Sequence, residues 1–102
     1  MKAEIQYSGI AVRDLDRVWS DVYRASGNSN IASEYVAELM DKIEAKADFP
    51  KSGKPLYYEN AFTGYYYVAY KAYLAFYRLK DEKMLVDRVL LGKSDYIRRL
   101  HL

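Results

Sequence analysis

The stretch from residue 64 to residue 100, GYYYVAYKAYLAFYRLKDEKMLVDRVLLGKSDYIRRL, decides the fold. It holds three runs rich in Tyr, Val, Leu and Phe, which are strand formers, at residues 65–70, 73–80 and 84–91. The connections Lys71-Ala72 and Asp81-Glu82-Lys83 are short enough to force antiparallel hairpins. The stretch therefore predicts a three-stranded meander, followed by a glycine, a basic residue and a short polar tail.

The first half of the chain predicts one strand and two helices. Residues 2–7 alternate between polar and apolar side chains, as a short strand does. Ser8 is a suitable N-cap for a helix over residues 9–25, and Gly27 suits the left-handed stop of that helix. Asn30 is then expected to cap a second helix that runs to about residue 47.

Both predicted helices are amphipathic, so they should form an antiparallel hairpin whose apolar stripe faces the sheet. The stripes are Ala11, Leu15, Val18, Trp19 and Val22 in the first helix, and Ala32, Val36, Leu39, Met40 and Ile43 in the second. Residues 50–63, with two prolines and two glycines at their edges, are expected to be a loop. The predicted fold is one α+β domain over residues 1–102, β-α-α-β-β-β. An antiparallel sheet packs against the helix hairpin, and a short C-terminal helix or tail follows.

The composition is that of an ordinary globular domain, with 51% hydrophobic and 29% charged residues in a chain of 102. The absence of cysteine excludes disulfides and thiolate metal sites, and a single histidine leaves no ligand set for a metal. No apolar run approaches the roughly 20 residues that a membrane span needs. We expect a cytoplasmic protein without metal, cofactor, membrane contact or small-molecule substrate.

The net charge of +2 hides an asymmetry between the two halves. Residues 1–48 hold 6 basic and 9 acidic residues, a net charge of −3, whereas residues 49–102 hold 10 and 5, a net charge of +5. A basic sheet half suits an anionic partner, although solvated strands and turns also carry lysine.

Several basic side chains of the second half alternate with tyrosines, a pattern suited to phosphate contact and base stacking. In the strand over residues 73–80, alternation places Arg78 and Lys80 on the same face as Leu74 and Phe76. Further candidates for binding a target or a nucleic acid are Lys71, Lys93, Arg98 and Arg99. The simpler alternative is that the arginines at 78 and 88 pair with Asp81, Asp87 or Asp95 and that the tail arginines are solvated.

Two other residue types invite a functional interpretation. The chain has 12 tyrosines, and seven of them lie between Tyr57 and Tyr73; most are expected to be half-buried packing residues, although an exposed tyrosine face would suit a protein partner. His101 lies one residue from the end, and we expect it to be inert.

The segment FYRLKDEKMLVDRVLLGKSDY resembles the C-terminal half of the RelE/ParE superfamily of toxins from bacterial type II toxin–antitoxin systems. The first half is similar too. Its matching residues are Tyr7-Ser8, Ala11, Asp14-Leu15 and Trp19, then Asn30, Ala32, Tyr35-Val36, Leu39, Ile43-Glu44, Phe49-Pro50 and Gly53-Lys54-Pro55. The resemblance covers nearly the whole chain and rests on the order and spacing of short motifs. It implies a growth-inhibiting toxin that a cognate antitoxin neutralises by wrapping the helix hairpin and the sheet edge.

The resemblance leaves the target open. A RelE-like toxin cleaves mRNA on the ribosome, but the positions of its strand lysines fall on Tyr65 and Tyr67, and those of its arginines on Leu74 and Ser94. Tyr96 lies in the right tail but comes early after Gly92. Most of that catalytic set is absent, which favours a ParE-like inhibitor of DNA gyrase without catalytic residues. If the protein is an endoribonuclease instead, the candidates for catalysis are Arg78, Arg88 and Tyr96. A further alternative is a non-toxic module that binds nucleic acid or protein.

Overall fold

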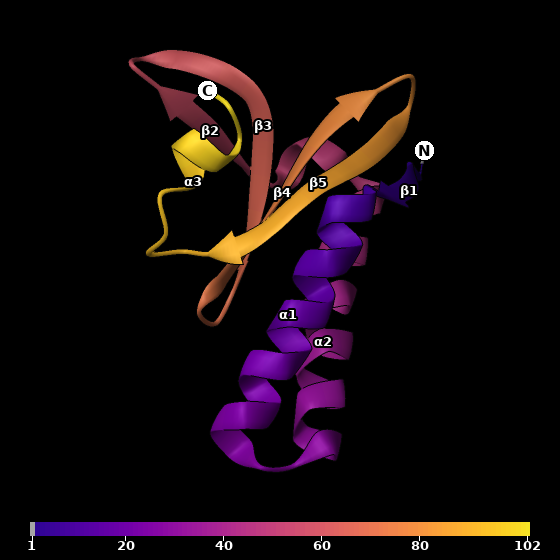
Figure 1. Ribbon diagram of the computed structural model, residues 1–102. Coiled ribbons are helices and arrows are strands. Elements are labelled where there is room, and N and C mark those ends of the chain that lie inside the picture. Colours follow the sequence, from indigo (N-terminus) through magenta and orange to yellow (C-terminus); the bar gives the residue numbers. More distant parts are fainter. Residues whose placement is uncertain (1) are drawn as a thin grey trace.

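A computed structural model describes residues 2–102, and Figure 1 shows its arrangement. The elements in chain order are β1 (Glu4–Tyr7), α1 (Gly9–Ser26), α2 (Ser29–Glu44), two 3₁₀ turns (Ala45–Asp48 and Pro50–Ser52), β2 (Lys54–Tyr58), β3 (Ala61–Tyr70), β4 (Tyr73–Lys80), β5 (Lys83–Leu91) and α3 (Tyr96–Arg99). The predicted α+β class, with a helix hairpin on a sheet and a short C-terminal helix, is confirmed. The sheet has one strand more than predicted.

The five strands form one sheet in the order β1-β5-β4-β3-β2. The strands from β2 to β5 are antiparallel neighbours, as the short turns predict, whereas β1 lies parallel to β5 at one edge. Because β5 begins at Lys83, the last turn has two residues, Asp81 and Glu82, both with positive φ. The sheet is therefore mixed at one edge and antiparallel elsewhere.

The caps of the helices explain where the hairpin turns. Ser8 Oγ accepts a hydrogen bond from the Ala11 N–H (2.9 Å), and Gly27 ends α1 at a φ of 66°. The prediction that Asn30 caps the second helix is wrong. Asn28 is the cap, because its side-chain oxygen accepts from the N–H groups of the second and third helical residues, at 2.9 and 3.2 Å. The helix ends at Glu44, and a 3₁₀ turn continues it to residue 48.

The prediction of a loop over residues 50–63 is wrong, because this segment holds β2 and the start of β3. A two-residue turn with positive φ at Glu59 and Asn60 joins the two strands. Leu56 is buried, so β2 contributes to the core despite its proline. Gly53 precedes the strand, and a Cβ there would lie 2.1 Å from the Tyr77 hydroxyl oxygen, a close approach that only glycine permits.

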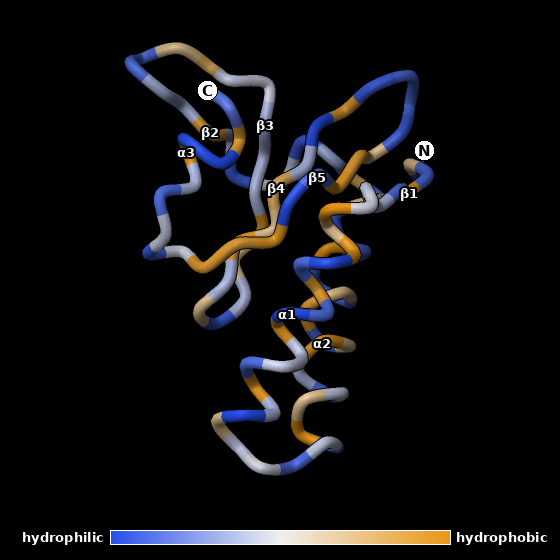
Figure 2. Tube along the Cα trace, viewed as in Figure 1, coloured by the Kyte–Doolittle hydropathy of each residue, from blue (hydrophilic) through white to orange (hydrophobic). Residues whose placement is uncertain are grey.

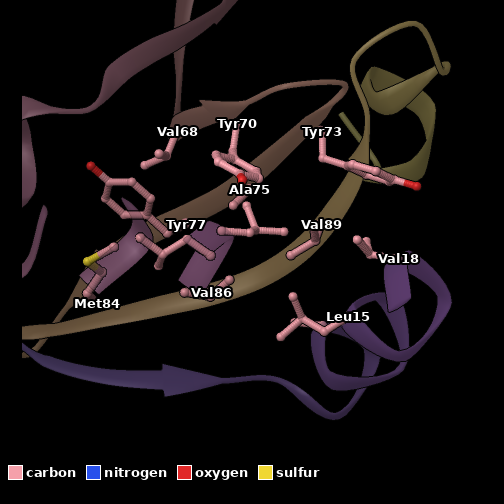
Figure 3. Close-up of a cluster of buried hydrophobic side chains, with 13 residues drawn as sticks. Leu15, Val18, Val68, Tyr70, Tyr73, Ala75, Tyr77, Met84, Val86 and Val89 are labelled. Carbon is pink, nitrogen blue, oxygen red and sulfur yellow. The ribbon is translucent and has the colours of Figure 1, made fainter. Parts of the chain in front are cut away.

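The main core lies between the helix pair and one face of the sheet (Figure 3). In this view Leu15 and Val18 of α1 point toward Val86 and Val89 of β5. The predicted stripes are confirmed for the buried residues Ala11, Leu15, Val18, Ala32, Leu39 and Ile43. Trp19 is the exception, because its ring stacks on Tyr23 and its N–H donates to Ser33 outside the core. The hydropathy colouring in Figure 2 shows the same division, with hydrophobic residues where the helices face each other and the sheet.

A second, smaller apolar cluster covers the opposite face of the sheet. Phe76 of β4 is fully buried there among Leu56, Leu90 and Leu100. The C-terminal segment around α3 lies over this face (Figure 1), with Tyr96 and Ile97 packed against the cluster. The alternation predicted for β4 is therefore confirmed. No helix within residues 2–102 is long and apolar enough to cross a membrane.

Candidate functional site

A β-bulge in β5 determines where the polar residues of the sheet point. Tyr77 pairs with Val86 and Phe76 pairs with Arg88, so Asp87 is an extra residue in β5. Val86 and Val89 both belong to the helix-side core, and the residues between them point elsewhere. Asp87 and Arg88 consequently reach polar partners on two different elements.

Arg88 forms a largely buried ion pair with Asp14 of α1. Its Nε and Nη2 atoms donate to the two carboxylate oxygens at 2.8 and 3.2 Å, and the Val89 N–H donates to the same carboxylate at 2.9 Å. The Asp14 side chain is 1% exposed and that of Arg88 is 17% exposed. The hydrogen bonds to Asp14 raise the pKa of Arg88 above its ordinary value. The pair ties the first turns of α1 to β5.

Arg78 forms a second, more exposed pair with the bulged Asp87. The Arg78 Nε donates to Asp87 Oδ2 at 2.7 Å, and the Tyr65 hydroxyl donates to the same oxygen at 2.9 Å. The hydrogen bond to Asp87 raises the pKa of Arg78. Burial, followed by the bond to Asp87, raises the pKa of Tyr65 to about 12. The predicted pairing of Arg78 with an aspartate is thus present, whereas Arg88 uses a partner 74 residues away.

A groove of about 200 Å³ lies between the start of α1, β5 and the C-terminal segment. Its polar lining brings together Tyr65, Asp87, Arg88, Arg99 and His101. A smaller hollow of about 140 Å³ lies along α1, and its charged lining consists of Arg17, Asp14, Asp21 and, again, Arg99. This cationic groove can bind an anionic group and has one imidazole at its rim. It is our candidate functional site.

The remaining sequence-predicted residues lie outside the groove. The Tyr96 ring packs against Phe76, with ring centroids 5.1 Å apart, and Arg98 is an exposed side chain 3.9 Å from Asp95. The exposed side chain of Lys93 lies in the loop before α3. Lys71, in the turn before β4, lies over the Tyr35 and Tyr70 rings. Lys80 is the last residue of β4, about 23 Å along the strand from its first residue, Tyr73. The structure thus brings Arg88 and Arg99 together in the groove, places Arg78 beside it through the ion pair with Asp87, and separates them from the rest.

His101 lines the groove, a position that sequence reasoning did not predict. Its position near the end of the chain predicts an inert side chain, yet the tail folds back so that His101 lines the groove. Its backbone φ is 60°, and its N–H donates to the Arg98 carbonyl at 3.0 Å. Only the packing of Leu100 on the sheet brings the histidine there, so no local pattern in the sequence signals it.

The positions that correspond to the RelE-type cations have a structural role in this chain. Tyr65, Tyr67 and Leu74 pack against the cluster around Phe76. The hydroxyl of Ser94 donates to the Leu91 carbonyl at 2.6 Å. Leu100 of the C-terminal segment packs on this face of the sheet. Within residues 2–102, no group of three or more acidic or histidine side chains is placed to hold a metal ion.

Comparisons with known proteins agree with this fold. The family model for the ParE toxin of the type II toxin–antitoxin system parDE matches residues 5–96. The chromosomal ParDE system from P. aeruginosa has a TM-score of 0.72 at 16% identity, covering 88% of this chain and 96% of that one. The RelBE2 toxin–antitoxin complex from Mycobacterium tuberculosis has a TM-score of 0.64 at 19% identity, covering 92% and 95%.

The DinJ–YafQ toxin–antitoxin complex from E. coli is also similar, with a TM-score of 0.54 at 15% identity, covering 94% of this chain and 99% of that one. At these identities the likeness to solved structures concerns the fold alone. No curated protein matches the chain significantly. The family model, however, spans nearly the whole sequence, and the chain belongs to the ParE toxin family of type II toxin–antitoxin systems.

Proposed function

We propose that this protein stops growth by binding DNA gyrase, in the cytoplasm, and that it needs no catalytic residues to do so. One observation carries the proposal: the strand positions where a RelE-type toxin holds its cations are Tyr65, Tyr67 and Leu74 in this chain, and they pack against the apolar cluster that includes Leu100 of the C-terminal segment. A ribonuclease needs an accessible base and unpaired cations around the scissile phosphate. In this chain Arg78 is paired with Asp87, and Phe76 is fully buried.

We also propose that a cognate antitoxin neutralises the protein. The similar solved structures from P. aeruginosa, M. tuberculosis and E. coli are toxin–antitoxin systems or complexes. In this chain the helix pair extends beyond the sheet and leaves large apolar side chains exposed, among them Val12, Tyr23 and Ile31 (Figure 1). Such side chains suit an antitoxin segment that packs along the hairpin.

The test combines labelling in cells with a purified assay. Protein, DNA and RNA synthesis are pulse-labelled minutes after the protein is induced without antitoxin, and supercoiling by purified gyrase is titrated with the purified protein. We expect DNA synthesis to fail first and supercoiling to fall in proportion to the dose, with recovery on addition of antitoxin. If protein synthesis fails first, or growth continues undisturbed, the gyrase proposal is wrong.

The cationic groove supports one alternative, a ribosome-dependent endoribonuclease. Arg99 and His101 line the groove together with Tyr65, and among the salt bridges within residues 2–102 neither of the two takes part. Under this alternative, Arg99→Ala and His101→Ala abolish toxicity, whereas Arg98→Ala, whose side chain is 86% exposed beside Asp95, leaves it intact. Antitoxin binding by each variant reports on its folding. Toxicity that survives both groove substitutions excludes the groove as an active site.

A further inference from the structure

A row of aromatic rings runs from the core to the solvent across β4, β3 and β2. Tyr77 is fully buried and stacks on Tyr66, with centroids 5.6 Å apart. Phe62 follows at 5.3 Å from Tyr66, and Tyr57 at 5.9 Å from Phe62. The last two side chains are 46% and 58% exposed. The row is thus anchored in the core and open at its outer end.

The helices do not cover this outer end. Figure 1 shows the β2–β3 hairpin curving away from the body on the side opposite the tips of α1 and α2. Of the nine large apolar side chains exposed within residues 2–102, Tyr57 and Phe62 contact each other at this end of the row, beside the partly buried Tyr66. Apolar side chains concentrated in this way mark a surface for a partner.

The exposed rings of Tyr57 and Phe62 and the partly buried ring of Tyr66 surround a hollow of about 280 Å³, which Lys51 and Pro55 complete. Aromatic-lined hollows of this kind accept prolyl or aliphatic side chains of an extended segment, whose ordering costs little entropy. The single charge in the lining is the lysine, and Lys54 follows at the start of β2. The hollow is therefore complementary to an apolar side chain flanked by carboxylates.

The free edge of β2 does not offer ordinary strand pairing. Pro55 lacks an N–H group, the register of β2 shifts between Pro55 and Tyr57, and Lys54 begins the strand. These three features blunt an edge against addition of another strand. A partner must consequently be held by side chains in the hollow.

We propose that this hollow is a docking site for an extended, acidic segment of a partner protein that inserts a prolyl or aliphatic side chain between Tyr57, Phe62 and Tyr66. The ring geometry favours a peptide over single-stranded nucleic acid. The rings already touch each other at interplanar angles of 53° and 67°, so no parallel-sided slot for a base exists between them. This inference is independent of whether gyrase is the target.

The test uses three labelled probes and fluorescence anisotropy. One peptide, Glu-Glu-Pro-Leu-Pro-Glu-Glu, carries the expected chemistry; a second has lysine in place of each glutamate; the third probe is an oligothymidylate of eight nucleotides. We expect saturable binding of the acidic peptide, at least about tenfold tighter than that of the other two probes. Tighter binding of the oligonucleotide, or no preference for the acidic peptide, overturns the proposal.

Matched variants locate the binding. Phe62→Ala should weaken binding of the acidic peptide about tenfold, because truncation of an aromatic anchor typically costs a complex that much. Tyr58→Ala is the control, because this exposed ring follows Tyr57 in β2 and alternation puts it on the other face of the sheet. Lys51→Glu, a surface change, should remove the preference for the acidic peptide. Equal effects of the Tyr58 and Phe62 substitutions, or an unchanged preference in the Lys51 variant, overturn the assignment.

Discussion

Asp14 is the one charged residue that is buried within residues 2–102, with 2% of its surface exposed. Burial of a carboxylate is costly unless it is paired and hydrogen-bonded. Arg88 and the Val89 N–H supply both, and they come from the strand that follows the bulge. The position of α1 on the sheet therefore depends on a buried polar contact within a largely apolar interface.

Removal of Arg88 should destabilise the fold strongly. In Arg88→Ala the Asp14 carboxylate stays buried without its partner, and we expect a loss of about 3–5 kcal/mol in the free energy of unfolding, measured with urea. Arg78→Ala is the control; its side chain is 46% exposed, so the loss should be at most about 1 kcal/mol. Similar losses in the free energy of unfolding for the two variants would contradict a special structural role of the buried Arg88–Asp14 pair. A loss of toxicity in Arg88→Ala consequently does not identify a catalytic residue.

The residues of the candidate site illustrate what a sequence can predict at this scale. Alternation in β4 correctly places Arg78 beyond the apolar part of the strand, near an aspartate of the next strand. The partner of Arg88 lies 74 residues away on a helix, and the bulge that directs Arg88 to it has no sequence signature. Side-chain partners across such separations depend on how the elements pack.

At the scale of elements, the β3–β4 hairpin is fastened to both helices by tyrosines. The Tyr70 hydroxyl donates to Glu38 of α2, and the Tyr73 hydroxyl donates to Asp21 of α1 at 3.3 Å. The hydrogen bond to Glu38, with burial, raises the pKa of Tyr70 to about 12. Burial, with the charge of Asp21, raises the pKa of Tyr73 to about 12. Both bonds require the neutral phenol.

Alkaline pH should therefore release this hairpin from the helices. A tyrosine pKa raised from 10.0 to about 12 stabilises the fold fully below pH 10, and the contribution is lost as the pH rises through 12. We expect the urea midpoint to fall over this interval, while absorbance at 295 nm reports phenolate formation. Glu38→Gln should lower the pKa of Tyr70 and move its titration to lower pH. Glu34→Gln, one turn earlier on α2, is the control, and an equal shift in both variants would contradict the assignment.

The strand β2 shows where a local pattern misleads. Two prolines and two glycines indicate a loop, because proline cannot donate to a ladder and glycine is a poor strand former. The segment is nevertheless a strand because it lies at the sheet edge, where the missing N–H of Pro55 costs little, and because Leu56 is buried against Phe76. Edge position is a property of the assembled sheet.

On the scale of the whole molecule, the elements differ in how well they are shielded from solvent. The strands β4 and β5 lie inside the sheet, with helices on one face and the C-terminal segment on the other. The tip of the helix hairpin, by contrast, projects beyond the sheet (Figure 1), and residues 23–31 are all exposed. Local opening should begin at this tip, where few buried contacts oppose it.

Hydrogen exchange followed by NMR tests this distribution. We expect the slowest amides in β4 and β5, close to the global stability, and exchange faster by orders of magnitude at the hairpin tip and the Glu59-Asn60 turn. The middle of α1, around Leu15, serves as the internal reference for a helical but covered segment. Equal protection of the tip and this reference would show that the hairpin opens only with the whole fold.

The sequence by itself determined the two amphipathic helices, the tight turns of the meander, the alternation in β4 and the family. These features follow from backbone periods and turn chemistry that act over a few residues. Only the tertiary structure decided that β1 lies parallel to β5, that Arg88 meets Asp14, and that the tail brings Arg99 and His101 to one groove. Those contacts join distant parts of the chain. They form because the helices must bury one face of the sheet and the C-terminal segment the other.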